Sequence, residues 1–415
     1  MSILEARKPI ENEISICAKP GDRHVFRFLS KVRVHERPLT DPGPAAPDLV
    51  VFQAGQNLKF VKDFKHLPQQ LWACAQQGSG KVVFDGSSEG KAHDPAQTDL
   101  LHEALVRVGA PVEQGVYITQ NRQYAADYAA HRRAAGLSPG MRIVVYDYWI
   151  RRALSHYERK GPRIFRGRLK TFKERQPERL RRFISLNFTA RPTKLVFLTR
   201  LMQEDLWDLG YVSFGGFEQM KLIKNWKYKR MRSDFLKLPG FEAQAASLEP
   251  WLAQLAERGR FLLGAAQEER SADTMVRPDH MPEYQQSWFS VVTETEMLDR
   301  PARITEKALK PLLNGHPFIV FGNPGSLALI RRLGFVTFPE LVDESYDEEP
   351  DPARRFELAF AQLRRLCRLD EAELAQMIGG MRDKLVFNMS WGLTRLPRLY
   401  ADTLDDAMLA SVLEP

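Results

Sequence analysis

Short apolar runs alternate with longer amphipathic stretches in the first part of the chain. Four of these runs end in turn residues: Leu49–Gln53, Lys81–Asp85, Val116–Thr119 and Arg142–Asp147. The stretches Thr98–Val108 and Gln123–Ala135 carry apolar residues at helical spacing. Buried strands separated by helices are typical of βα units, so this pattern predicts a parallel sheet covered by helices.

The same alternation returns in the last third of the chain, with glycines between the elements. The pattern predicts strands at Trp288–Thr293, Pro317–Phe321 and Phe335–Phe338. It predicts helices at Thr305–Leu313, Ser326–Leu333, Pro352–Cys367 and Asp370–Lys384. We therefore expect a second α/β domain.

Charge marks the region between the two patterns. Residues Arg151 to Arg182 contain 13 Lys/Arg and 3 Glu, and a second basic stretch runs from Lys221 to Arg232. The whole chain of 415 residues has 60 Lys/Arg against 52 Asp/Glu, which indicates an anionic partner. We place the domain boundary near Arg182, which gives domains 1–182 and 183–415.

Cysteine usage and hydropathy exclude several classes of protein. The three cysteines, Cys17, Cys74 and Cys367, are far apart, which excludes a disulfide framework and a cysteine-based zinc site. The charged N-terminus does not resemble a signal peptide, and no apolar run is long enough to span a membrane. We expect a cytoplasmic protein, with any membrane association peripheral on the inner membrane.

The segment from Thr305 onward carries the strongest chemical pattern. Thr305 can cap a helix whose free N–H groups suit a phosphate, and Lys307 and Lys310 share one face of that helix. Glu306 can accept hydrogen bonds from ribose hydroxyls. His316 precedes a predicted buried strand, and Gly322 ends that strand in a turn.

The run from Ile304 to Phe338 resembles the donor-binding half of nucleotide-sugar glycosyltransferases with two Rossmann-like domains, the GT-B architecture. Thr305-Glu306-Lys307 is similar to a fucosyltransferase motif, which implies that Glu306 binds the ribose and Lys307 a phosphate. His316-Pro317 is similar to a motif of bacterial sialyltransferases and Kdo (3-deoxy-manno-octulosonic acid) transferases, which implies that His316 contacts the phosphate of a CMP-sugar. The resemblance covers about Arg182 to Asn388 and implies two Rossmann-like domains facing a central cleft.

Acidic residues near this segment have alternative interpretations. Glu294 follows a predicted strand. It has two interpretations: a residue that binds donor hydroxyls, or a solvated surface residue. The cluster from Asp343 to Glu349 could hold a divalent cation, but contiguous acids are more often a solvated helix lead-in. No DxD-type pair ends a strand in this half, so we expect no metal and no cofactor besides the nucleotide-sugar co-substrate.

Sugar transfer also needs a carboxylate, as a base or as a nucleophile. Asp234 is an acid among many cations, and Glu158 lies among arginines. Asp85 follows a strand of the N-terminal domain, as Glu89 does a few residues later. Asp234 is the first candidate, although it could instead cap a helix that begins near Phe235.

These observations predict a glycosyltransferase whose N-terminal domain binds the acceptor and whose C-terminal domain binds the donor. The preferred donor is CMP-Kdo, with a GDP-sugar of the fucosyl type as the alternative. The expected acceptor is a bacterial surface glycan or a lipid-linked one, and Arg151–Arg182 could contact an anionic membrane. The rival function is nucleic-acid binding, because Phe165, Phe172 and Phe183 are interspersed among the basic residues.

Overall fold

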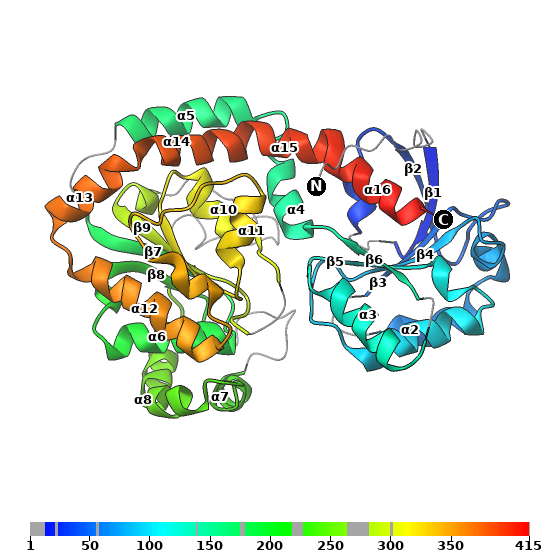
Figure 1. Cartoon of the computed structure of the whole chain (residues 1–415), viewed down its shortest axis with the longest axis horizontal. Helices are drawn as coiled ribbons and strands as arrows, with labels where there is room; N and C mark the ends of the chain where they lie inside the picture. The colour runs from blue at the N-terminus through cyan, green and yellow to red at the C-terminus, as the bar shows by residue number, and fades with distance from the viewer. Residues whose placement is uncertain are drawn as a thin grey trace. The chain divides into compact units, whose positions relative to one another are not determined.

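The computed structural model describes residues 13–20, 24–54, 58–137, 140–174, 179–217, 227–263, 282–298 and 302–414. The chain divides into two compact units (Figure 1). The first comprises residues 1–151 together with 397–415, and the second comprises residues 152–396. This division differs from the boundary near Arg182 predicted from the sequence, which placed residues 183–415 in one domain.

The first unit contains a parallel sheet of the expected kind. Its strands are β1 Glu13–Ala18, β2 Arg33–Pro38, β3 Leu49–Gln53, β4 Lys81–Asp85, β5 Gly115–Thr119 and β6 Arg142–Val145. Their order is β2-β1-β3-β4-β5-β6, and every pair is parallel. The helices are α1 Ala73–Gln76, α2 Pro95–Arg107, α3 Tyr124–Ala134 and α16 Asp405–Leu413, with short 3-10 turns such as η1 Val25–Phe28.

Apolar residues cover both faces of this sheet. One core contains Phe52, Phe64, Trp72 and Phe84 and continues into α2 through Leu101 and Leu105. The opposite core contains Val51, Val83 and Ile118 and is completed by Met408, Leu409 and Val412 of α16. The first unit therefore needs the last residues of the chain to cover one face of its sheet.

The second unit is built around a smaller parallel sheet. Its strands are β7 Arg181–Asn187, β8 Gly210–Phe214, β9 Ser287–Thr293 and β10 Phe318–Phe321, in the order β10-β9-β7-β8. Its helices are α5 Gly161–Lys173, α6 Pro192–Gln203, α7 Tyr228–Leu236, α8 Glu242–Arg258, α10 Glu306–Leu313, α11 Ser326–Arg332, α12 Pro352–Arg368, α13 Glu371–Gly380 and α14 Arg382–Ser390. Helices α4 Tyr148–Ser155 and α15 Leu396–Leu399 span the divisions between the units, and the π-helical turns η9 Trp391–Arg395 and η10 Tyr400–Leu404 flank α15.

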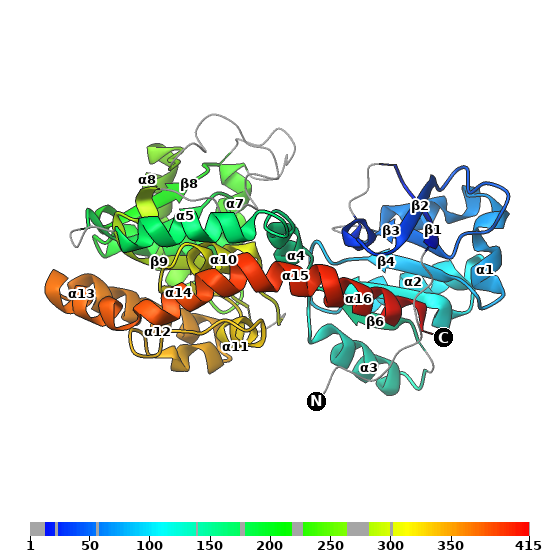
Figure 2. The same cartoon turned by 90° about the horizontal axis from the view of Figure 1, so that it is seen from above.

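Helices pack on both faces of the second sheet (Figures 1 and 2). Phe197 of α6 packs against Phe321 of β10 and Phe360 of α12. Helix α10 lies on the other face, beneath α14 and η9. The predicted α/β class with two Rossmann-like units is therefore confirmed.

Most strands and helices predicted from the sequence are confirmed, but Phe335–Phe338 is not a strand. Side chains satisfy its backbone instead of a neighbouring strand. The Asn388 side chain makes two hydrogen bonds to the backbone of Val336. Its Oδ1 accepts from the Val336 N–H, and its Nδ2 donates to the Val336 carbonyl, both at 2.9 Å. Glu344 accepts from the N–H of Phe338 at 2.8 Å. The apolar run alone did not distinguish a strand from this loop, which side-chain hydrogen bonds hold in place.

Candidate functional site

The carboxyl ends of β7 and β9 form the point at which the second sheet changes direction. From β7 the chain crosses through α6 to β8, whereas from β9 it crosses through α10 to β10 on the other side. In open parallel sheets, ligands bind outside the carboxyl ends of the strands at such a switch point. The strand ends are joined there, because Thr293 donates its hydroxyl to the Asn187 side chain at 2.5 Å.

Glu294 links the end of β9 to the start of α10. It is buried, and its carboxylate accepts from the Thr305 N–H at 3.1 Å and from the Thr305 hydroxyl at 2.6 Å. Thr305 caps α10, as predicted, and accepts from the Lys307 N–H at 3.4 Å. These bonds fix the first turn of α10 against the sheet edge, so the predicted neighbours Glu294, Thr305, Glu306 and Lys307 do lie together.

Lys307 holds its ammonium group among three oxygens. Its Nζ lies 3.0 Å from Glu306 Oε1, 3.1 Å from Thr305 Oγ1 and 3.3 Å from Thr295 Oγ1. Burial disfavours the charged form of Glu306, but the nearby Lys307 and Lys310 outweigh it and hold the pKa of Glu306 below its usual value. Glu306 is therefore an ionised acceptor at neutral pH.

Lys194 is a residue of this cluster that the sequence analysis did not single out. It lies in the first turn of α6, is 2% exposed, and makes no hydrogen bond or ion pair with the described part of the chain. Burial, and next the charge of Lys307, lower the pKa of Lys194 to about 7, against the opposing effect of Glu294 and Glu306. Burial of an ammonium group without a bonded partner is costly, and an anionic ligand bound beside Lys194 would offset that cost.

The neighbouring residue ties Lys194 to the rest of the site. Thr193 donates its hydroxyl to the carbonyl of Thr295 at 3.4 Å, so the start of α6 meets the loop after β9. The sequence signal for Lys194 was available: a buried strand followed by Pro-Thr-Lys at a helix start. A lysine at a helix start was also what drew attention to α10.

Gly322 and Lys310 also belong to this edge. A Cβ placed on Gly322 would lie 2.8 Å from Ser326 Oγ, which would have to move, and in ordinary contact with Glu294 Cγ at 3.4 Å. Lys310 lies one turn along α10 and contributes to the low pKa of Glu306. Three lysines and two glutamates converge here, which favours an anionic ligand that also offers hydroxyl groups.

The structure does not bring His316 to this cluster. Helix α10 runs back from the carboxyl edge, about 12 Å for its eight residues, and His316 follows its far end. The His316 side chain is fully buried, with Nδ1 3.0 Å from Ser290 Oγ and the ring edge-on to Tyr284 at 5.2 Å. Its position before β10 is that of a core residue at the amino end of the sheet.

The three carboxylates proposed for catalysis lie on different elements, Asp85 in the first unit and Asp234 and Glu158 in the second. Asp85 is buried at the end of β4, where it accepts from the Val25 N–H at 2.9 Å and the Ser87 N–H at 3.0 Å. Asp234 lies inside α7, half exposed and 3.7 Å from Arg230, so it does not cap a helix near Phe235. Glu158 is half-buried in the turn after α4. The catalytic assignment of each stays a prediction.

The acidic segment Asp343–Glu349 supports neighbouring elements. Asp347 is buried and accepts from the N–H groups of Leu327 and Ala328 at the start of α11. Burial raises the pKa of Asp347, although these two bonds oppose the shift. Across the described ranges, no group of three or more histidine, cysteine, aspartate or glutamate side chains has the arrangement of a metal site.

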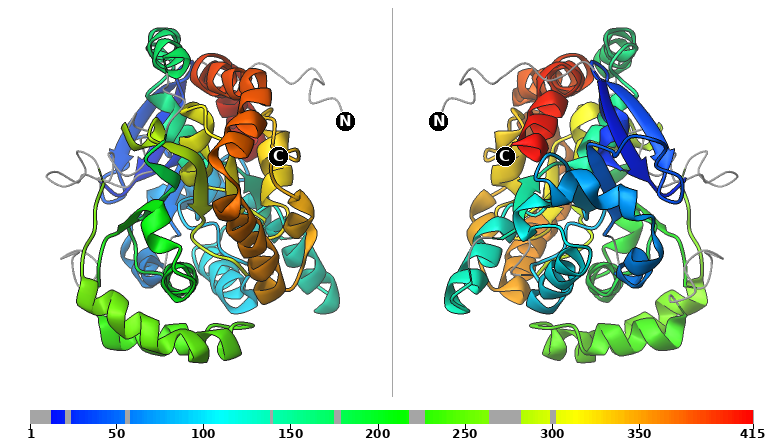
Figure 3. Two further views of the ribbon diagram at one scale, coloured as in Figure 1. Left: turned by 90° about the vertical axis from the view of Figure 1, so that its left-hand side faces the viewer. Right: turned by 90° about the vertical axis from the view of Figure 1, so that its right-hand side faces the viewer.

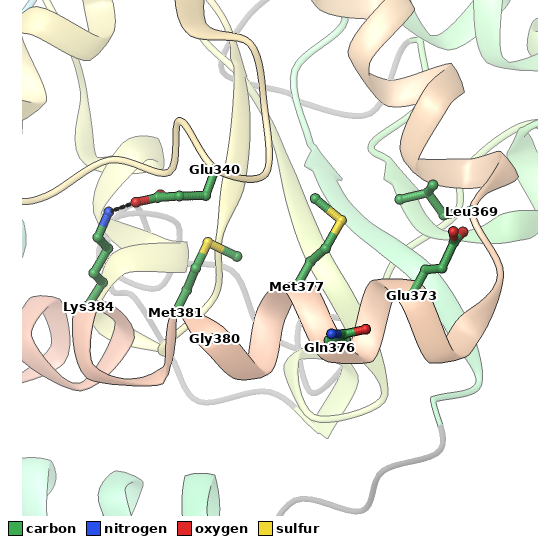
Figure 4. Close-up of a pocket in the computed structure, with 8 residues that line it drawn as sticks. All are labelled: Glu340, Leu369, Glu373, Gln376, Met377, Gly380, Met381 and Lys384. Carbon is green, nitrogen blue, oxygen red and sulfur yellow. Dashed lines mark hydrogen bonds and ion pairs between the residues drawn. The ribbon is translucent and has the colours of Figure 1, made fainter.

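A cavity of about 520 Å³ lies elsewhere in the second unit, along α13 and the start of α14 (Figure 4). Leu369, Met377 and Met381 give it an apolar wall, and Lys384 pairs with Glu340 at its rim. Its lining includes Leu369, which follows the last residue of α12. Helix α12 begins near the carboxyl end of β10, where Arg355 donates to the Gly322 carbonyl, so its other end and the cavity lie toward the amino edge of the sheet. None of the predicted donor-binding residues lines it.

Comparisons with known proteins find structural similarity only. No protein-family model matches the sequence, and neither does any curated protein. An α,α-trehalose-phosphate synthase (UDP-forming) from Burkholderia vietnamiensis is 13% identical, with a TM-score of 0.42 over 87% of this chain and 71% of its own. The trehalose-6-phosphate phosphatase N-terminal domain of Candida albicans is 9% identical, with a TM-score of 0.43 over 98% of both chains.

The catalytic domain of starch synthase IV from Arabidopsis thaliana, solved with ADP and acarbose, is also similar. It is 10% identical, with a TM-score of 0.37 over 89% of this chain and 74% of its own. Similarity at this level carries no weight for the chemistry of this chain, which rests on the residues at the sheet edge.

Lys194 predicts a pH dependence for any phosphate ligand at this site. With a pKa of about 7, Lys194 loses its charge as the pH rises from 7 to 9, while a terminal phosphate is already ionised. Affinity for a ligand with a terminal phosphate is therefore expected to fall with rising pH, by up to tenfold per unit, with proton uptake on binding. Calorimetry in buffers of different ionisation enthalpy measures both quantities.

Lys194→Met is the matching variant, because methionine keeps the unbranched apolar length without the charge. We expect this variant to bind a phosphate ligand weakly at pH 7. Its affinity should no longer change between pH 7 and 9. An unchanged pH profile in this variant would assign the proton to another group.

Proposed function

We propose that this protein is a glycosyltransferase that binds a nucleotide-sugar donor at the carboxyl edge of the second sheet. The observation that carries the proposal is the convergence of Lys194, Glu306 and Lys307 at the switch point of a parallel sheet. Lys194 and Lys307 neutralise the phosphates of the donor, and the first turn of α10 adds its N–H groups. Glu306, ionised at neutral pH, accepts hydrogen bonds from the ribose hydroxyls.

These contacts stabilise the leaving nucleotide as the sugar departs. Negative charge develops on the phosphate oxygen when the bond to the anomeric carbon breaks, and fixed cations beside that oxygen lower the barrier. The resemblance of the Thr305–Lys307 motif to glycosyltransferases agrees with this chemistry. The acceptor in the proposal is a surface glycan or a lipid-linked glycan bound by the first unit.

The identity of the donor is a finer part of the proposal. CMP-Kdo was preferred because of the His316-Pro317 dipeptide, but His316 lies at the other end of α10 from the cluster. The remaining residues, Glu306 and Lys307, address a ribose and a phosphate, which CMP-Kdo and GDP-fucose both contain. We therefore propose both donor classes, without a metal ion.

Nucleic-acid binding is the less favoured alternative. It rested on aromatic residues among the cations of Arg151–Arg182, but Phe183 is fully buried in β7. The guanidinium of Arg382 covers the Phe172 ring at 5.7 Å. Of the three aromatic residues, only Phe165 is left half-buried without a covering group in the described residues, so the stacking surface that such an interface uses is reduced to one ring.

Nucleotide screening tests the proposed function. Thermal shift and calorimetry with CMP, GDP and UDP are expected to identify one nucleotide that stabilises the folded protein, by about 2.7 kcal/mol at a hundredfold excess over Kd. The sugar conjugate of that nucleotide is then supplied with extracted glycolipid acceptors and the release of free nucleotide is measured. If none of the three nucleotides binds at millimolar concentration, the proposal fails.

A further inference from the structure

Helix α5 presents a continuous basic stripe to solvent. The exposed residues Arg163, Arg166, Lys170 and Lys173 recur at intervals of three and four, which aligns them on one face. No acidic residue occurs between Gly161 and Lys173. The cations of the Arg151–Arg182 segment therefore do not all serve the same purpose.

Other cations of that segment are internal. Arg151 is buried against Asp405 at 2.8 Å, and Arg168 is buried with its guanidinium donating to the Leu313 carbonyl at 2.7 Å. These two residues hold helices together. The stripe on α5 has no such role, because its four side chains are exposed and the inward face of α5 supplies the packing.

Helix α14 lies beside α5 (Figures 1 and 2). Arg382 and Arg395 are exposed at the two ends of α14 and η9, and between them Phe387 is 45% exposed. Two adjacent helices form the outer layer over α10. Arg382 covers the ring of Phe172 on α5 at 5.7 Å, and we call the surface made by Arg163, Arg166, Lys170, Lys173 and Arg382 the basic platform.

We propose that the basic platform binds the surface of an anionic lipid bilayer. Lysines and arginines on the exposed face of a helix match the negative charge of acidic headgroups. The exposed acids closest in sequence are Glu174, 4.0 Å from Lys170, and Asp383, so cations dominate the surface. This proposal does not depend on the proposed transferase activity.

Vesicle binding provides the direct test. The full chain is sedimented with vesicles of phosphatidylcholine alone and with vesicles that also contain phosphatidylglycerol. We expect binding only to the anionic vesicles, with loss of binding as salt screens exposed charges over about 8–10 Å. In the variant R163Q/R166Q/K170Q/K173Q, partition is expected to fall by about a hundredfold or more.

The matched control removes four other exposed cations from the same unit, with the same change in net charge. Lys229, Arg230, Arg232 and Lys237 lie on or just after α7, which Figure 3 shows at the opposite end of the second unit from α5. Their replacement by glutamine is expected to leave vesicle binding within about threefold. An equal loss in both variants would show that total charge, not the basic platform, is responsible, and would overturn the proposal.

Two further results would also overturn it. One is equal binding to neutral and anionic vesicles. The other is binding of duplex DNA or single-stranded RNA, lost in the α5 variant, without vesicle binding. Melting temperature and nucleotide binding are measured on both variants. These controls confirm folding and separate failure of the basic platform from failure of the donor site.

Discussion

Replacing Asp405 with alanine is expected to destabilise the first unit by about 3–5 kcal/mol. Asp405 is fully buried, and its carboxylate accepts from Arg151 Nε at 2.9 Å and 3.1 Å and from the Tyr146 hydroxyl at 2.5 Å. Without it, the guanidinium of Arg151 stays buried with its charge uncompensated. Denaturant unfolding followed by tyrosine and tryptophan fluorescence measures the loss.

The neighbouring residue supplies the control for this prediction. Asp406 also lies in the first turn of α16, so both aspartates have the same relation to the helix dipole. Its partner, Lys31 at 3.2 Å, is half exposed, and such pairs contribute about 0–1 kcal/mol. If Asp405→Ala lowers the free energy of unfolding by no more than Asp406→Ala does, the buried ion pair does not hold α16 on the sheet.

Replacing Lys307 with alanine is expected to weaken binding of the nucleotide found by screening by about 1.5–3 kcal/mol. This is the range for a hydrogen bond to a charged group and corresponds to about a 10- to 150-fold increase in Kd. Glu306 would also lose its nearest cation, so its pKa is expected to rise toward the usual value. Calorimetry at constant pH measures the affinity.

Two variants accompany this measurement. Lys237→Ala removes an exposed lysine outside the site and is expected to bind as the wild-type protein does. Lys307→Arg keeps the charge and is expected to recover part of the affinity. Unchanged affinity in a folded Lys307→Ala variant would remove Lys307 from the donor site.

Local sequence pattern predicted the buried strands well, because a short apolar run bounded by turns has few alternatives. Lys81–Asp85 and Pro317–Phe321 are examples that match β4 and β10 within a residue. β2 was missed because it is an edge strand with the polar sequence RVHERP, and its burial pattern is almost entirely exposed. The sequence also did not predict that residues 397–415 belong to the first unit, because α16 packs on a sheet whose strands lie some 270 residues earlier in the chain.

The candidate site was predicted in part for a related reason. Thr305, Glu306 and Lys307 are consecutive, and helix capping is a local property that a sequence displays. Lys194 starts a helix after a buried strand, which the sequence displays, but it joins the others only because β7 pairs with β9, a contact between distant segments that no local pattern reveals. His316 follows α10 closely in sequence, but a helix separates its two ends in space, so proximity along the chain was misleading.

The second unit is inserted, as one continuous segment, into a first unit whose chain is split. During synthesis, residues 152–396 are complete before α16 leaves the ribosome, so the inserted unit can fold while the first sheet still has one bare apolar face. Val51, Val83 and Ile118 stay without their cover until Met408, Leu409 and Val412 arrive. The nascent first unit therefore passes through a period in which an apolar face is exposed, and a chain truncated within α16 is expected to aggregate.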